Sequence, residues 1–346
     1  MALKRAQRRQ AVVEPAAAVE VDAVETTLRP RSLAEYVGQA RIKEHLHIHM
    51  SAARGRSEPL GHTLLHGPPG LGKTTLAHII ALEMQSQLKV TSGPAIEKPG
   101  DLASLLTNLQ RGDVLFIDEM HRLRPVVEEM LYGAMEDCVL DIMIGKGPAA
   151  RSVRLTVQPF TLIGATTKAG AISAPLRDRF LHHFKLGFYE HAEMCQIVGR
   201  SAGILGVELM ASAVSRVAGA SRATPRIANR LVRAVRDFAQ MRKAASVDLA
   251  CVDETLHSLD IDDDGLDATD RRLLLAIVEA FAGGPVGLST LAAILAEEEE
   301  TLEDVYEPYL MQQGYLQRTP KGRMATPKAF AKLGRDMPQE MQRGML

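Results

Sequence analysis

The chain has 346 residues, a length that favours two or three domains, and 46% of them are hydrophobic, enough for a core in each domain. A formal net charge of -1 at pH 7 excludes a polycation that attracts nucleic acid over its whole surface, so such contact requires a local basic patch. The absence of tryptophan and an aromatic content of 4% argue against binding single strands by base stacking.

Residues 1–25 predict a flexible arm rich in Ala, Val and Glu. Its basic start resembles a targeting peptide, but Glu14 and Pro15 interrupt the apolar core that should follow, so that interpretation is weaker. The cysteines, Cys138, Cys195 and Cys251, are spaced neither for a metal knuckle nor for a disulfide framework. No apolar stretch approaches the roughly 18 residues of a membrane span. We therefore expect a cytoplasmic protein without a membrane partner.

Residues 26–189 alternate helical patterns with short apolar runs. A helical pattern through Leu33, Tyr36 and Val37 precedes a second helix over residues 42–53. Continuous apolar runs predict buried parallel strands at residues 62–66, 89–91, 114–117 and 161–165. This order is typical of a doubly wound α/β domain.

A β-hairpin is predicted over residues 138–157, with its turn at residues 145–148. Leu140, Ile142 and Ile144 alternate onto one face of it. That apolar face either packs on its own domain or is covered by a partner, and the residues alone do not decide between the two.

Residues 190–260 read as a small all-α domain, with helices over 193–205, 211–218 and 226–242. An acidic linker follows at residues 260–265. The last unit, residues 263–346, predicts helices over 270–282, 288–297 and 301–313 and then a tight hairpin. Three helices followed by a hairpin indicate a winged helix.

A phosphate-binding loop occupies residues 67–75. Its sequence, GPPGLGKT from Gly67 to Thr74, follows an apolar strand and opens a helix, which is the context that the motif requires. Backbone N–H groups and the helix N-terminus favour phosphate, Lys73 can reach the β- and γ-phosphates of ATP, and Thr74 can bind Mg²⁺. A glycine-rich turn that binds nothing is the weaker alternative.

An acidic pair, Asp118 and Glu119, ends the strand at residues 114–117. Asp118 is placed to hold Mg²⁺, and Glu119 is placed to polarise the attacking water. A strand-ending acid pair is common by itself, but together with the phosphate loop it predicts ATP hydrolysis.

Further segments resemble one family of motors. The phosphate loop, DEMHR at 118–122, GATT at 164–167 and RDRF at 177–180 resemble AAA+ ATPases. The segments TSGP at 91–94, YGAMED at 132–137, GPAAR at 147–151, TPRIANR at 224–230, GGPVG at 283–287 and QRTPKGRMA at 317–325 resemble the RuvB family. The likeness extends over residues 28–326. It implies an α/β AAA+ P-loop ATPase domain, a small all-α lid domain and a C-terminal winged-helix domain.

The resemblance also implies roles for single residues. Thr167 would be the first sensor of the γ-phosphate, Arg226 the second sensor, and Arg179 an arginine finger that reaches a neighbouring subunit's nucleotide. A solvated helix face is the plain alternative for Arg177 and Arg179. The residues implied in nucleotide binding are Leu28, Arg29, Gly70, Gly72, Lys73, Thr74, Thr75, Glu136, Asp137, Cys138, Tyr189 and Arg226.

The sequence departs from the family pattern at several positions. Leu181 and Ala223 replace glycines, Gly133 replaces a proline, and the segment 182–184 is atypical. None of these changes removes a catalytic group, although Leu181 could alter how Arg179 is presented.

The turn of the C-terminal hairpin predicts a DNA contact. Arg318, Lys321 and Arg323 suit phosphates, although a charged turn without a ligand is the plain alternative. The preceding helix carries acids, Glu303, Asp304 and Glu307, which would repel DNA, so we expect binding independent of sequence and steeply dependent on salt.

The family likeness implies an ATP-driven motor for Holliday junction branch migration in recombination, DNA repair and the SOS response to DNA damage. It would be a homohexamer that encircles duplex DNA, binds RuvA through the hairpin at residues 138–157, and works beside RuvC. A clamp-loader-like switch and a winged-helix regulator that merely senses nucleotide are the alternatives. His45, His47 and His49 share a predicted helix, and His45 and His49 lie one turn apart, a spacing that can bind zinc; no third ligand is evident nearby, so a solvated helix surface is favoured.

Overall fold

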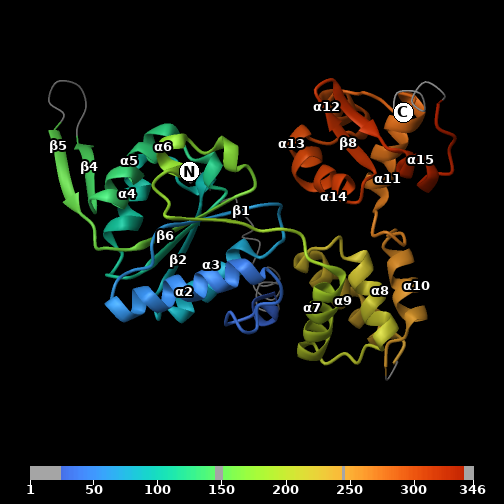
Figure 1. Cartoon of the computed structure of the whole chain (residues 1–346), viewed down its shortest axis with the longest axis horizontal. Coiled ribbons are helices and arrows are strands. Elements are labelled where there is room, and N and C mark those ends of the chain that lie inside the picture. Colours follow the sequence, from blue (N-terminus) through green and yellow to red (C-terminus); the bar gives the residue numbers. More distant parts are fainter. Residues whose placement is uncertain (1–24, 145–150, 244–245, 339–346) are drawn as a thin grey trace, which may run out of the picture.

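The computed structural model describes residues 25–144, 151–243 and 246–338, and the predicted arm falls outside them apart from its last residue. An α/β domain, a helical unit and a winged-helix unit follow one another along the chain, which confirms the predicted fold class (Figure 1). None of the described helices combines the length and the apolar character needed to cross a membrane.

The α/β domain is built on a five-stranded parallel sheet with the order β2-β3-β6-β1-β7. The strands are β1 Thr63–His66, β2 Leu88–Ser92, β3 Val114–Asp118, β6 Thr161–Thr166 and β7 His182–Lys185. The first four confirm the strands predicted from apolar runs. The edge strand β7 was not predicted, because alternate residues of it are exposed and it carries no continuous apolar run.

Helices cover both faces of this sheet, with α2 and α3 on one face and α4, α5 and α6 on the other (Figure 1). They are α2 Ala40–Arg56, α3 Lys73–Glu83, α4 Pro99–Thr107, α5 Pro125–Glu136 and α6 Ala174–Arg177, with 3₁₀ turns at Gly93–Ala95, Met120–Arg122 and Ala169–Ala171. The helical prediction through Leu33, Tyr36 and Val37 was wrong. Turns occupy that segment, and they still bury Leu33 and Tyr36, which share the three-residue spacing of a helical face.

The helical unit contains α7 His191–Ile204, α8 Ala211–Ala220, α9 Pro225–Met241 and α10 Leu249–Ser258. The first three confirm the predicted helices, and α10 was not predicted. Buried residues of these helices belong to the same hydrophobic cluster as the α2–α3 face of the sheet. The helical unit is therefore packed against the α/β domain.

The C-terminal unit has the helix–helix–helix–hairpin order of a winged helix. Its elements are α11 Ala268–Leu275, continued by the π-helical segment η5 Ala276–Ala280, α12 Leu288–Leu295, α13 Glu299–Thr301, η6 Leu302–Tyr306, α14 Glu307–Gln312, β8 Leu316–Thr319, β9 Gly322–Ala325 and α15 Pro327–Lys332. The segments α13, η6 and α14 form one continuous helix. A separate hydrophobic core fills this unit.

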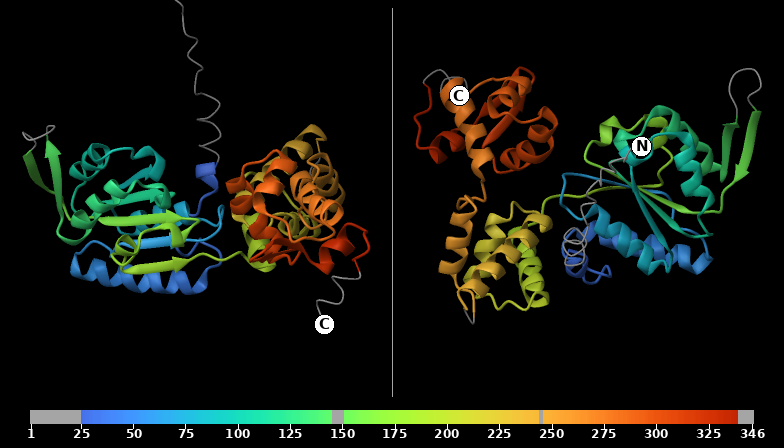
Figure 2. Two further views of the ribbon diagram at one scale, coloured as in Figure 1. Left: turned by 90° about the horizontal axis from the view of Figure 1, so that it is seen from above. Right: turned by 180° about the vertical axis from the view of Figure 1, so that it is seen from behind.

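The predicted hairpin is present as β4 Val139–Ile144 and β5 Arg151–Thr156, and it projects from the end of the α/β domain opposite the other two units (Figures 1 and 2). Of the two alternatives left open for its apolar face, packing on its own domain applies to Leu140, which is buried in that domain's core. Ile142 is partly buried against the same core. The side chain of Ile144 and the turn at residues 145–148 lie outside the described residues.

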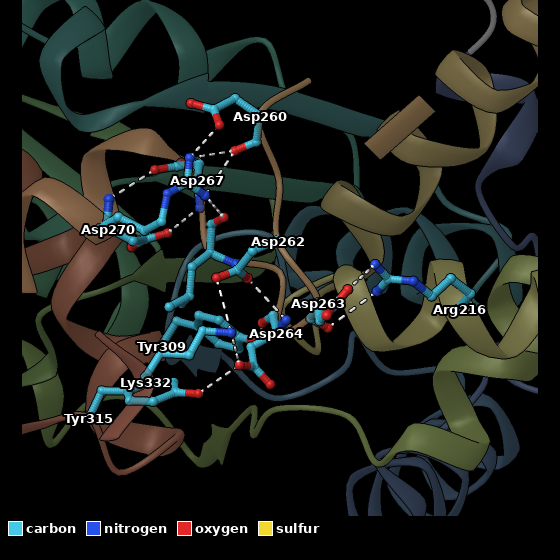
Figure 3. Close-up of polar contacts among 12 residues, drawn as sticks. Arg216, Asp260, Asp262, Asp263, Asp264, Asp267, Asp270, Tyr309, Tyr315 and Lys332 are labelled. Carbon is cyan, nitrogen blue, oxygen red and sulfur yellow. Dashed lines mark hydrogen bonds and ion pairs between the residues drawn. The ribbon is translucent and has the colours of Figure 1, made fainter. Parts of the chain in front are cut away.

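Side chains of the helical unit and of the winged helix both bind the acidic linker (Figure 3). Arg216 of α8 forms an ion pair with Asp263 at 2.8 Å, and Lys332 of α15 pairs with Asp264. The hydroxyl of Tyr315 also donates to the Asp264 carboxylate at 2.9 Å. The linker therefore connects the lid to the winged helix through fixed contacts.

A buried ion pair joins the same two units. Arg222, which precedes α9, is 7% exposed and donates to the fully buried Asp270 of α11 at 3.0 Å. Its guanidinium also lies 4.8 Å from the ring centroid of Tyr309. Because a buried arginine requires a partner, this pair fixes the winged helix against the lid.

We predict that Asp270→Ala lowers the free energy of unfolding of the winged-helix unit by about 3 kcal/mol, because Arg222 would remain buried without its partner. Denaturant unfolding measures the loss. Asp336→Ala, an exposed change in the same unit, is the control and should stay within about 0.5 kcal/mol of the unmodified chain. Equal losses for the two variants would contradict an anchoring role for the pair.

Candidate nucleotide site

The site lies at the carboxyl ends of three neighbouring strands. The phosphate loop follows β1, Asp118 and Glu119 end β3, and Thr167 follows β6. Since β3, β6 and β1 are adjacent and parallel, their following loops meet at one edge of the sheet. Ligands of open α/β sheets bind at this edge.

The phosphate loop combines a left-handed glycine with a buried lysine. Gly72 adopts φ 99° as it caps α3, a left-handed conformation that favours glycine. Lys73 is 9% exposed, and its Nζ donates to the carbonyls of Gly67 and Pro68, both at 2.8 Å. Burial lowers the pKa of Lys73 to about 8, even though the Asp118 carboxylate acts in the opposite direction. An entering phosphate would relieve this cost by supplying a partner of opposite charge.

One cleft brings together most of the residues predicted for the ATP site. It is lined by Arg29, Gly70, Gly72, Lys73, Thr74, Thr75, Asp118, Glu119, Thr167 and Arg226. Arg226 reaches it from the first turn of α9, and its backbone N–H lies 3.5 Å from the Gly70 carbonyl oxygen. Two domains of the chain therefore contribute cationic groups to the same cleft.

An adjoining pocket contains Leu28 and Tyr189, and it shares Arg29, Gly72 and Thr75 with the cleft. The hydroxyl of Tyr189 donates within a buried cluster formed by the Tyr36 hydroxyl and the Leu71 carbonyl, at 2.9 and 3.1 Å. This pocket is mostly apolar, which suits a nucleobase beside the phosphate loop.

An uncommon backbone conformation and local polar contacts hold the acidic pair. Glu119 has φ 47°, an uncommon conformation for this residue, and its N–H donates to the Asp118 carboxylate at 2.9 Å. The carboxylate of Glu119 pairs with Arg122 at 3.1 Å. A side chain at Gly93 would begin 2.4 Å from the Glu119 carbonyl oxygen, which explains the glycine in the TSGP segment.

Asp118 and Thr74 provide a carboxylate and a hydroxyl on the same cleft wall. Hard oxygen donors in this small number fit Mg²⁺, which keeps water and phosphate oxygens as its remaining ligands. Among the described residues there is no group of three or more His, Cys, Asp or Glu side chains that could hold a metal by itself. Of the histidines at residues 45–49, His49 packs on His182 with ring centroids 4.1 Å apart.

The predicted residues Arg179, Glu136, Asp137 and Cys138 do not line this cleft. Arg179 donates to the carbonyl of Pro175 at 2.7 Å and to Glu136 at 3.1 Å, and its guanidinium lies 4.4 Å from the Tyr132 ring centroid. Its Nε is buried and has no hydrogen-bond partner among the residues that the structure describes. Arg179 and Glu136 thus form a second cluster, apart from the chain's own phosphate loop.

Among the departures from the family pattern, Ala223 has an unfavourable backbone conformation. Its φ of 51° is the left-handed conformation for which glycine is favoured, so alanine there costs about 1 kcal/mol. Leu181 is 73% exposed and leaves Arg179 within the cluster just described. Gly133 lies inside α5, where a proline would lack the N–H for a helical hydrogen bond.

The wing presents two of its three predicted basic residues. Lys321 is exposed, and Arg318 is exposed while pairing with Glu303 at 2.7 Å. The expectation that Arg323 offers its side chain to DNA was wrong: it is 8% exposed and its guanidinium is held by the buried Glu307 at 2.6 Å. Arg323 is the cross-strand partner of Arg318, so the two share one face of the hairpin, and Arg323 is buried there because its guanidinium pairs with Glu307.

Sequence reasoning missed several residues around the cleft. Asn229 lines both pockets and lies three residues after Arg226 on α9, so helical spacing within the TPRIANR segment could have identified it. Arg200 donates to the Leu28 carbonyl at 2.7 Å from α7, and Arg122 pairs with Glu119. Arg200 has no local sequence signal, since its partner is 172 residues away.

Comparisons with known proteins agree with this architecture. Residues 28–186 match the model described as the Holliday junction DNA helicase RuvB P-loop domain, residues 189–262 the RuvB AAA lid domain, and residues 263–334 the RuvB C-terminal winged helix domain. The solved Thermotoga maritima RuvB Holliday junction branch migration motor is 49% identical, with a TM-score of 0.83 over 90% of this chain and 100% of that one. A single-residue mutant of the same protein is 50% identical with a TM-score of 0.84, over 90% of this chain and 99% of that one. With its three domains matched in order and about half of its residues shared with a solved relative, the chain belongs to the RuvB family of AAA+ ATPases.

Proposed function

We propose that the chain is an ATP-driven motor that moves duplex DNA through Holliday junctions, in recombination and repair in the cytoplasm. The observation that carries this proposal is the cleft in which the phosphate loop, the acidic pair, Thr167 and Arg226 meet. A winged helix with an exposed basic turn stands on the same chain. The proposed function therefore combines an ATP-hydrolysing site with a DNA-binding unit.

In this proposal Lys73 binds the β- and γ-phosphates, while Thr74 and Asp118 hold Mg²⁺, which supplies charge neutralisation on the phosphates. Glu119 polarises the attacking water, and its present pairing with Arg122 orients the carboxylate. Thr167 and Arg226 sense the γ-phosphate from two different domains.

The cluster of Arg179 and Glu136 supports action between subunits. It lies away from the chain's own cleft, and an arginine finger has to reach transferred phosphate. We infer that Arg179, Glu136, Asp137 and Cys138 complete a neighbour's site in a homohexameric ring.

The projecting hairpin is our candidate for docking RuvA, with RuvC joining the junction complex. Because Leu140 and much of Ile142 are used by the domain core, the contact depends on the outer part of β4 and β5, including Ile144. The distance of this hairpin from the winged helix would separate partner docking from DNA contact (Figure 1).

The first prediction from the proposed function concerns pH. Nucleotide binding should raise the pKa of Lys73 from about 8, so binding takes up a proton and affinity falls as pH rises. We expect ATP affinity, measured by equilibrium titration, to weaken about tenfold between about pH 8 and pH 9.5. Lys73→Arg keeps its charge throughout and should remove this pH dependence. An equally steep decline in the arginine variant would contradict the assignment.

The second prediction concerns assembly. Lys73→Ala and Arg179→Ala subunits should each be inactive alone, because one lacks the loop and the other the finger. An equal mixture should recover about one quarter of normal ATP turnover, from interfaces that pair an intact loop with an intact finger. A mixture that stays inactive would show that Arg179 does not act across subunits.

The third prediction concerns DNA. Arg318→Ala and Lys321→Ala should each weaken duplex binding for all sequences and lower the slope of log affinity against log salt by about one. Arg323→Ala should instead lower the stability of the winged helix, because Glu307 would be left buried and unpaired. Fluorescence anisotropy across a salt series measures the first two, with Arg335→Ala as a control in the same unit. Unchanged binding for both would remove the wing as the contact.

A further inference from the structure

A lysine of the ATPase domain is held by two acids of the winged helix. Lys168 immediately follows Thr167, and its Nζ lies 3.1 Å from the Glu300 carboxylate and 3.2 Å from that of Asp304. Glu300 and Asp304 are four residues apart on the continuous helix of α13 and η6, so they present one face. The winged helix is thus joined directly to the loop that carries the predicted sensor.

The backbone on the ATPase side of this contact is fixed. The N–H of Lys168 donates to the Thr166 hydroxyl at 2.9 Å, and that hydroxyl is hydrogen-bonded to the His121 ring nitrogen at 3.0 Å. His121 lies two residues after Glu119. Hydrogen bonds therefore connect the backbone of Lys168 to the loop that holds Thr167 and to the loop that holds the acidic pair.

An adjacent face of the same helix contacts the wing. Glu303, one residue before Asp304, pairs with Arg318, a predicted phosphate contact. DNA phosphate and Glu303 would compete for that arginine. The acids that seemed unsuited to a DNA-binding helix therefore serve as ion-pair partners toward the wing and toward the ATPase domain.

The helix also approaches the phosphate loop itself. Asp304, Val305 and Tyr306 line one side of a cavity whose other side includes Pro69 and Gly70. The contact at Lys168 is therefore part of a continuous junction between the winged helix and the nucleotide site.

We propose that Lys168, held by Glu300 and Asp304, is a positioning residue through which DNA binding at the winged helix sets Thr167 in the nucleotide site. This inference rests on the proposed function, since it assumes that Thr167 senses the γ-phosphate and that the wing binds DNA. Through these ion pairs the winged helix and the nucleotide site can be coupled without a contact between Lys168 and ATP or DNA.

The test uses the full chain and measures ATP turnover with and without linear duplex. Lys168→Met should reduce duplex stimulation of kcat about fivefold, while KM for ATP and duplex affinity change less than about twofold. If Lys168 merely stabilised the fold, replacing it would impair duplex stimulation, ATP binding and duplex binding together. Lys168→Arg keeps the charge and should retain the stimulation.

Exchanging the charges of Lys168 and Glu300 distinguishes a loss of coupling from a general loss of stability. Lys168→Glu should abolish stimulation by repelling two acids, and adding Glu300→Lys should recover at least half of it. Glu299→Gln changes a neighbouring exposed acid that does not pair with Lys168, and it should have no effect. Normal stimulation in Lys168→Met, or no recovery in the exchanged pair, would overturn the inference while leaving the motor function intact. A lack of stimulation in the unmodified chain would contradict the motor function itself, and the coupling with it.

Discussion

The parallel alignment of β3, β6 and β1 is the constraint on which the nucleotide site depends. These strands are buried on both faces, so continuous apolar sequence fixes their place in the middle of the sheet. Their carboxyl ends then deliver the phosphate loop, the acidic pair and Thr167 to one edge. No single side chain creates the site, because its chemistry follows from three loops that share that edge.

Ion pairs and one arginine–carbonyl hydrogen bond between units place the remaining parts around this edge. Arg200 ties the lid to the segment at Leu28, Arg222 ties the lid to the winged helix, and Lys168 ties the winged helix to the ATPase domain. Through these contacts each of the three domains is joined to the other two beside the cleft. Movement of one domain therefore changes the surroundings of groups held by the other two.

Local pattern was sufficient to predict much of this arrangement and insufficient for the rest. The four apolar strands, the phosphate loop and the hairpins have signals within a few residues, and the structure contains all of them. The edge strand β7 lacks such a signal, and the turns around Tyr36 mimic helical spacing. Arg323 looked like a surface residue because its partner, Glu307, belongs to a different element. The pair of Lys168 and Glu300 spans 132 residues, so only the folded chain brings it into view.

The conformation of Arg179 bears on why a motor of this kind would turn over only when assembled. In the single chain its two terminal guanidinium nitrogens donate to Pro175 and Glu136, but within the described part of the chain Nε is buried without an acceptor. A buried unsatisfied donor costs about 1 to 3 kcal/mol. Engagement with a neighbour's phosphate would release that cost and replace a carboxylate partner by one of higher charge. If Arg179 serves a neighbouring subunit as proposed, an isolated subunit would keep its guanidinium at Pro175 and Glu136 until a neighbour offers phosphate. An arginine held in this way would limit ATP hydrolysis by subunits outside the ring.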